Sequence, residues 1–353
     1  MLVSNCVITK GFTKSTIYDL QYRNFFWISQ PLEKCIADKL PENELMYEDS
    51  EILQCLYENK LIVAFPKEIE LNFPKYCYDY YSPVKIQNAV IEISSSRFDK
   101  LRTLVLQLNE LGCRNLEIRV YQKCDEQKLI AFLITINDTS IESIDLYLPF
   151  HPEIATFVSN IHHKSVRYRI CCVHSVPEGT TIDKNNYGIF TNEILEKRIS
   201  CGNISPFYFK VNPDLFTESQ HYNTCLNRKV CIDVNGEIKN CPAMSRSFGN
   251  IKDTTIAEAI AKPGFKDLWS IRKDNIDVCK DCEFRYMCTD CRAFIKDPNN
   301  IYSQPAKCPY NPYLAKWQGD EGYITVEEWR HQNPDWEKSV ERHPLVKKPQ
   351  KVE

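Results

Sequence analysis

Apolar and polar residues alternate along the middle of the chain in a way that predicts strands and helices in turn. The predicted elements are strands over 86–93, 116–121, 144–148 and 168–173, and helices over 99–111 and 154–163. Gly112 follows the first helix, where a glycine commonly ends one. This order predicts a mostly parallel sheet within residues 84–200, and therefore an α/β fold class.

Residues 1–66 predict a small α/β unit with a hairpin over 7–9 and 15–19 and a closing strand over 61–65. Ser29 is a suitable cap for one helix, and a second helix is expected from Ser50 to about Asn59. This order resembles a winged helix, the architecture of leader-peptide recognition elements, which add a peptide as a strand to a sheet edge. A structural cap on the next domain and a DNA-binding unit are the alternatives.

The remaining segments differ in composition. Residues 67–83 are aromatic and interrupted by proline, which indicates a linker. Residues 201–318 hold all seven of the clustered cysteines, with short helices expected over 254–260 and 265–271. Residues 319–353 are polar with a basic end, and we expect a mobile or partner-contacting tail.

Charge and hydropathy exclude several classes of protein. Lys and Arg total 44 against 47 Asp and Glu, so no basic field favours nucleic acid as a partner. No apolar run approaches the ~20 residues that span a bilayer, and no signal peptide is evident, so we expect a cytoplasmic protein without membrane contact. None of the 10 glycines forms a phosphate-binding loop.

The chain has 17 cysteines, and in a cytosolic protein clustered cysteines indicate metal ligands rather than disulfides. Ten are scattered, mostly in apolar surroundings, and we interpret them as small buried side chains, with less certainty for Cys201 and Cys231. The ten are Cys6, Cys35, Cys55, Cys77, Cys113, Cys124, Cys171, Cys172, Cys201 and Cys231.

The other seven cysteines form a spaced pattern: Cys225, Cys241, Cys279, Cys282, Cys288, Cys291 and Cys308. The Cys-x2-Cys units are too close together for the usual zinc spacing, whereas dense thiolates suit iron–sulfur clusters. A hairpin with its turn at Asn235–Gly236 would bring the first two cysteines together. Zinc remains the alternative metal.

This arrangement resembles the SPASM domain of radical SAM proteins that modify peptides, although only two residues separate Cys288 from Cys291 where that motif has three. The sequences of residues 282–294 and 10–20 resemble those of the SPASM-domain peptide maturase of grasp-with-spasm systems. The resemblance implies two partners, a precursor peptide bound through its leader and an ATP-grasp ligase.

The resemblance also implies two [4Fe-4S] clusters. Cys225, Cys241 and Cys291 would hold the first cluster, and Cys279, Cys282, Cys288 and Cys308 the second. Relatives place a fourth ligand of the first cluster six residues before its first cysteine, where this chain has Ser219. Cys231 or Cys201 replaces it, or one iron has an open site.

One motif of the radical SAM family is missing. The first strand of the predicted sheet runs into residues 94–99, which contain no cysteine, and no Cys-x3-Cys-x2-Cys occurs in the chain. We therefore do not expect S-adenosylmethionine as a cofactor, and interpret residues 84–200 as a partial, degenerate radical SAM barrel. His162, His163 and His174 lack a partner pattern and are interpreted as surface or packing residues.

Three functions are compatible with these features. The first is an accessory protein of peptide maturation that binds the precursor and acts with the ligase. The second is an active redox or radical peptide-modifying enzyme that uses the auxiliary clusters. The third is a structural zinc adaptor. The sequence leaves open whether the protein is an enzyme.

Overall fold

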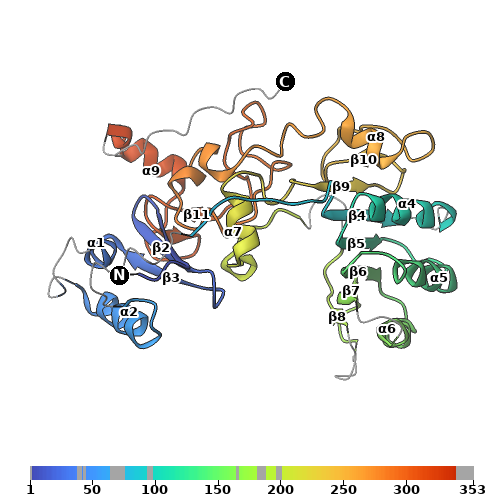
Figure 1. The fold of residues 1–353 in the computed structure, drawn as a ribbon, viewed down its shortest axis with the longest axis horizontal. Coiled ribbons are helices and arrows are strands. Elements are labelled where there is room, and N and C mark those ends of the chain that lie inside the picture. The colour runs from blue at the N-terminus through green and yellow to red at the C-terminus, as the bar shows by residue number, and fades with distance from the viewer. Residues whose placement is uncertain are drawn as a thin grey trace.

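The computed structural model describes residues 2–37, 42, 45–63, 76–93, 98–163, 167–180, 188–195 and 201–338. Figure 1 shows the N-terminal strands and a parallel sheet at opposite ends of the molecule, with the cysteine-rich loops between and above them. Among the described residues, no helix combines the length and apolarity needed to cross a bilayer.

The parallel sheet confirms the α/β prediction. Its strand order is β10-β9-β4-β5-β6-β7-β8, and every neighbouring pair is parallel except the β9–β10 hairpin. The strands are β4 Asn88–Ile93, β5 Asn115–Val120, β6 Ser143–Pro149, β7 Tyr168–His174, β8 Ile189–Phe190, β9 Lys229–Ile232 and β10 Ile238–Lys239. Because β9 pairs with β4, the sheet continues across the predicted domain boundary at residue 200.

Three helices cover one face of this sheet (Figure 1): α4 Phe98–Glu110, α5 Glu126–Ile136 and α6 Ile154–His162. Gly112 ends α4 as predicted, with a left-handed φ of 80°. Helix α5 was not predicted, because its apolar residues are nearly continuous and do not repeat with the 3.6-residue period of a helix. Asp125 caps it by accepting hydrogen bonds from the backbone N–H groups of Gln127 and Lys128.

The N-terminal unit contains β1 Cys6–Lys10, β2 Lys14–Asp19, β3 Asn24–Ser29, α1 Gln30–Ile36 and α2 Tyr47–Glu58. The predicted hairpin is β1–β2, and Ser29 caps α1 by accepting from the Leu32 N–H. The strand β3 was not predicted, and α2 begins three residues before Ser50. Of the strand predicted over 61–65, Ile62 forms a single bridge to Leu2, and 64 and 65 lie outside the described residues.

Short elements make up the cysteine-rich region: the 3-10 turns η2 Pro206–Tyr208, η3 Lys273–Asn275 and η4 Cys279–Asp281, the helices α7 Pro213–Ser219 and α8 Ile256–Ala261, and the strands β11 Tyr310–Asn311 and β12 Lys316–Trp317. The helix predicted over 254–260 is α8, which Thr255 and Glu258 cap reciprocally. The helix predicted over 265–271 is wrong, because turns occupy that segment and bury Phe265 and Trp269.

Much of the predicted polar tail is folded. Helix α9 Val326–Gln332 and the turn η5 Trp336–Lys338 follow residue 319. Trp329 is buried and stacks on Tyr313 with ring centroids 4.4 Å apart, and Phe12 of the N-terminal unit packs against its edge. Aromatic burial therefore fixes this segment to the protein. The basic end at Lys347 and Lys348 lies outside the described residues.

Candidate metal centre

Four cysteines predicted to act together line one cavity. Cys279, Cys282, Cys288 and Cys308 surround a space of about 400 Å³, part of which is open to solvent. The turn η4 starts at Cys279 and ends before Cys282, so both thiols of this Cys-x2-Cys unit face the same space. We call these four residues the second cage.

Aromatic side chains line part of the second cage, namely Phe209, Phe284, Tyr310 and Trp317. Burial raises the pKa of Cys279 to about 12 and that of Cys288 to about 11, while Lys273 opposes both shifts. The thiols are therefore protonated at neutral pH until a metal displaces their protons.

The other three predicted ligands also meet, and a fourth cysteine joins them. Burial raises the pKa of Cys225 to about 12, Lys229 opposes the rise, and the neighbouring thiols of Cys201, Cys241 and Cys291 add to it. We call these four cysteines the first cage. Their proximity places Cys201, which the sequence analysis offered as one of two substitutes, beside the three predicted ligands.

Local hydrogen bonds explain how distant segments reach the first cage. Asp233 accepts from the backbone N–H groups of Asn235 and Glu237, and Gly236 takes a φ of 78°, which turns the β9–β10 hairpin toward Cys241. On the other side, Asn223 accepts from the N–H of Cys225. The predicted hairpin is therefore confirmed.

Cys201 reaches the first cage because its neighbour is a glycine. Gly202 has a φ of 84°, and a Cβ built on it would lie 2.9 Å from the Cys291 sulfur. Lys307 donates to the Cys201 carbonyl oxygen at 2.7 Å, which holds the segment in place. Cys231, the other substitute, is buried in β9, and burial, the Glu92 carboxylate and the neighbouring Cys241 thiol raise its pKa well above the usual range.

Among the remaining predicted residues, His174 is buried, lies 3.1 Å through Nε2 from the Val120 carbonyl oxygen, and has a pKa that burial lowers. His162 and His163 are exposed. Of the scattered cysteines, Cys6, Cys113, Cys171 and Cys231 are buried as expected; Cys77 is exposed, and the others are half-buried.

The thiols of each cage are too far apart to bind a single metal ion together. Among the described residues, no three His, Cys, Asp or Glu side chains converge closely enough to coordinate a single metal ion. A [4Fe-4S] cluster takes its thiolates at the corners of a cube, so its ligand sulfurs stand farther apart than those around one ion. Four of the thiols line one cavity and the other four lie near one another, and each set has the four thiols that such a cluster requires.

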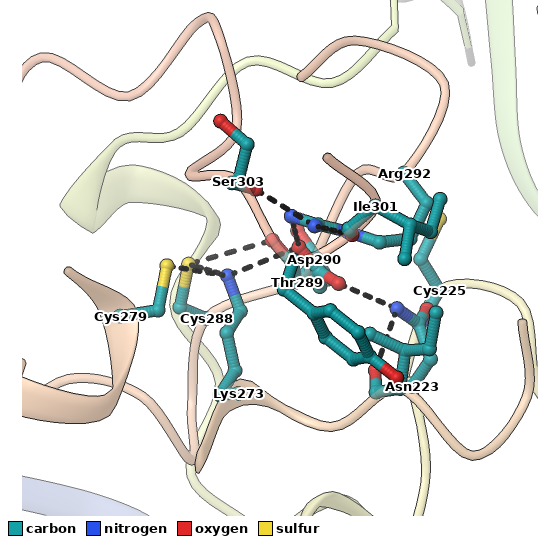
Figure 2. Close-up of polar contacts among 12 residues, drawn as sticks. Asn223, Cys225, Lys273, Cys279, Cys288, Thr289, Asp290, Arg292, Ile301 and Ser303 are labelled. Atoms are coloured by element: carbon teal, nitrogen blue, oxygen red, sulfur yellow. Dashed lines mark hydrogen bonds and ion pairs between the residues drawn. The ribbon is translucent and has the colours of Figure 1, made fainter. Parts of the chain in front are cut away.

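A buried ionic network, which the sequence analysis missed, lies between the cages. Asp290 contacts Lys273 at 3.6 Å and Arg292 at 2.6 Å, and Asn223 donates to it at 2.5 Å. Figure 2 shows Lys273 between Asp290 and the sulfur atoms of Cys279 and Cys288. The sequence did contain one sign of this network. Asp290 lies between Cys288 and Cys291, two predicted ligands, and a carboxylate buried there requires a positively charged partner.

The N-terminal unit docks beside the second cage through Glu283. Its carboxylate accepts from Trp27 Nε1 at 2.8 Å and from the Tyr310 hydroxyl, and its carbonyl oxygen accepts from the Tyr18 hydroxyl at 2.9 Å. Burial raises the pKa of Glu283. The sheet β1–β3 is therefore anchored one residue from the predicted ligand Cys282.

Comparison with known proteins identifies part of the cysteine-rich region. Residues 224–283 match the SPASM iron-sulfur cluster-binding domain. No curated protein matches the chain. Among solved structures, SuiB of Streptococcus suis aligns with 9% identity over 87% of this chain and 98% of its own, at a TM-score of 0.30, which is too low to carry an argument.

Proposed function

We propose that this protein holds two [4Fe-4S] clusters, one in each cage, and acts in the maturation of a ribosomally made peptide together with an ATP-grasp ligase. The observation that carries the proposal is the grouping of eight cysteines into two sets of four, with two members of each set inside residues 224–283, which match an iron-sulfur domain. Cys201, Cys225, Cys241 and Cys291 would hold one cluster, and Cys279, Cys282, Cys288 and Cys308 the other. The clusters would supply one-electron chemistry or a rigid core.

The buried charges fit this cofactor. Lys273 and Arg292 are 5% and 4% exposed and share the carboxylate of Asp290, which is 1% exposed. Two buried cations with one shared anion leave a positive excess, which is costly in the interior. A cluster with four thiolate ligands carries net negative charge next to Lys273 and would balance it.

The N-terminal unit supplies a place for the leader peptide. The strand β3 ends the described three-stranded sheet and so presents an unpaired edge, to which an extended peptide can add as a strand. Trp27 of β3 donates a hydrogen bond to Glu283, which is next to Cys282 in the sequence. A peptide added to the edge of β3 would therefore lie near the second cage. This arrangement favours an accessory, peptide-presenting role over an isolated redox enzyme.

Two measurements test the proposal. Anaerobically purified protein should be brown and contain about eight iron and eight sulfide per chain, as two four-iron clusters require. A labelled synthetic leader, taken from a precursor gene adjoining an ATP-grasp ligase gene, should bind in a titration where a scrambled leader does not. Colourless protein with zinc would refute the clusters, and no binding with or without the ligase would refute the peptide role.

A further inference from the structure

The most distinctive group outside the thiols is the ammonium of Lys273. Its Nζ lies 3.6 Å from the Cys288 sulfur and 3.9 Å from the Cys279 sulfur, on the inner side of the second cage. The side chain is only 5% exposed, whereas lysine is almost never fully buried unless paired. Figure 2 shows the ammonium aimed at both sulfurs.

The network behind Lys273 holds it in position. Asp290 contacts it from the side opposite the sulfurs, and Asn223 and Arg292 hold that carboxylate in turn. Arg292 also donates to the carbonyl oxygens of Ile301 and Ser303 at 2.9 and 2.8 Å. The cation therefore stands at a fixed distance from two predicted cluster ligands rather than on a flexible stem.

The ammonium of Lys273 has an opposite charge to pair with. The Asp290 carboxylate lies 3.6 Å from Nζ and compensates the buried cation. An ammonium held beside two sulfurs acts electrostatically on the charge of whatever those sulfurs bind.

We propose that Lys273 sets the reduction potential of the cluster in the second cage. The inference rests on the proposed function, because it requires the clusters. Adding one electron, supplied by a low-potential donor, makes a thiolate-bound cluster more negative. A fixed cation stabilises that reduced form and so raises the potential, as do hydrogen bonds from an ammonium to sulfur.

The test compares Lys273→Met, which removes the charge and the donors, with Lys273→Arg, which keeps both. Iron and sulfide are counted first. A redox titration with dithionite, followed by electron paramagnetic resonance, then gives the potential of each cluster. Cys225→Ala, which removes a ligand from the first cage, identifies the signal of the second.

Lys273→Met should keep its iron and make reduction of the second cluster at least about tenfold less favourable, equal to 59 mV for one electron, without moving the first. Lys273→Arg should shift it by less than half as much.

Full iron content with unmoved potentials in Lys273→Met would overturn the inference and leave the proposed function intact. Loss of the second cluster in Lys273→Met and also in Lys273→Gln would likewise overturn it, since the lysine would then retain the cluster rather than tune it. Wild-type protein without iron would overturn the proposed function itself.

Discussion

Asn223 donates a hydrogen bond to the Asp290 carboxylate at 2.5 Å, and this contact joins the segments that carry the two cages. Asn223 lies two residues before Cys225 of the first cage and also accepts from its N–H. Asp290 lies two residues after Cys288 of the second cage and directly before Cys291 of the first. The two cages are therefore parts of one polar framework.

Removing the charge of Asp290 should destabilise the protein. Asp290→Asn leaves Lys273 and Arg292 buried without their shared carboxylate, and breaking such a buried ion pair costs about 3–5 kcal/mol. Chemical denaturation measures the loss. Asp267→Asn, at an exposed position, should change the free energy of unfolding by less than about 0.5 kcal/mol. Equal stability of the two variants would contradict a role for the network.

Replacing Cys201 should remove iron, whereas replacing Cys231 should not. Cys201→Ala deletes one of four thiols in the first cage, so we expect the iron content to fall by up to about half, with one cluster signal lost or altered. Cys231→Ala leaves both cages intact. Iron analysis and electron paramagnetic resonance decide the matter, and the reverse pattern would assign the ligand to Cys231.

A methyl group at Gly202 should disturb the first cage. Gly202→Ala places a Cβ 2.9 Å from the Cys291 sulfur, so the cage must distort, and we expect iron loss from one cluster. Gly179→Ala controls for backbone strain, because Gly179 has a φ of 79° but a Cβ there meets nothing within 4 Å. If both variants retain full iron, the close approach of Gly202 to Cys291 has no bearing on the cage.

The free energy of unfolding of the metal-free protein should fall as the pH rises above about 8.5. Cys225 and Cys279 have pKa values of about 12 in the fold, against about 8.5 in an unfolded chain. As the pH rises, the unfolded chain loses these protons first, so each thiol removes up to about 1.4 kcal/mol of stability per pH unit between 8.5 and 12.

Denaturation from pH 7 to 10 measures this slope. In loaded protein the ligand thiols have already lost their protons, so a shallower slope is expected, set by structural thiols such as Cys113, whose pKa burial raises to about 12. Equal slopes with and without metal would show that the ligand thiols do not carry the effect.

The sequence by itself determined the parallel α/β region and the seven spaced cysteines. Strand and helix periods are local, so β4 to β7, α4 and α6 were predictable, and so was the Asn235–Gly236 hairpin, whose turn chemistry lies within a few residues. Cysteine spacing is also local. The resemblance to the SPASM domain therefore anticipated the region that matches it.

Only the tertiary structure decided which side chains meet. Cys201 lies 24 residues before Cys225, and no local pattern links them; chain folding brings them together, with Gly202 allowing the approach. Nothing in the sequence distinguishes Lys273 from a surface lysine, and its burial depends on packing against Asp290 and Cys288, which lie in a later loop. Long-range packing and charge compensation depend on the whole fold, which is why the sequence pattern did not contain them.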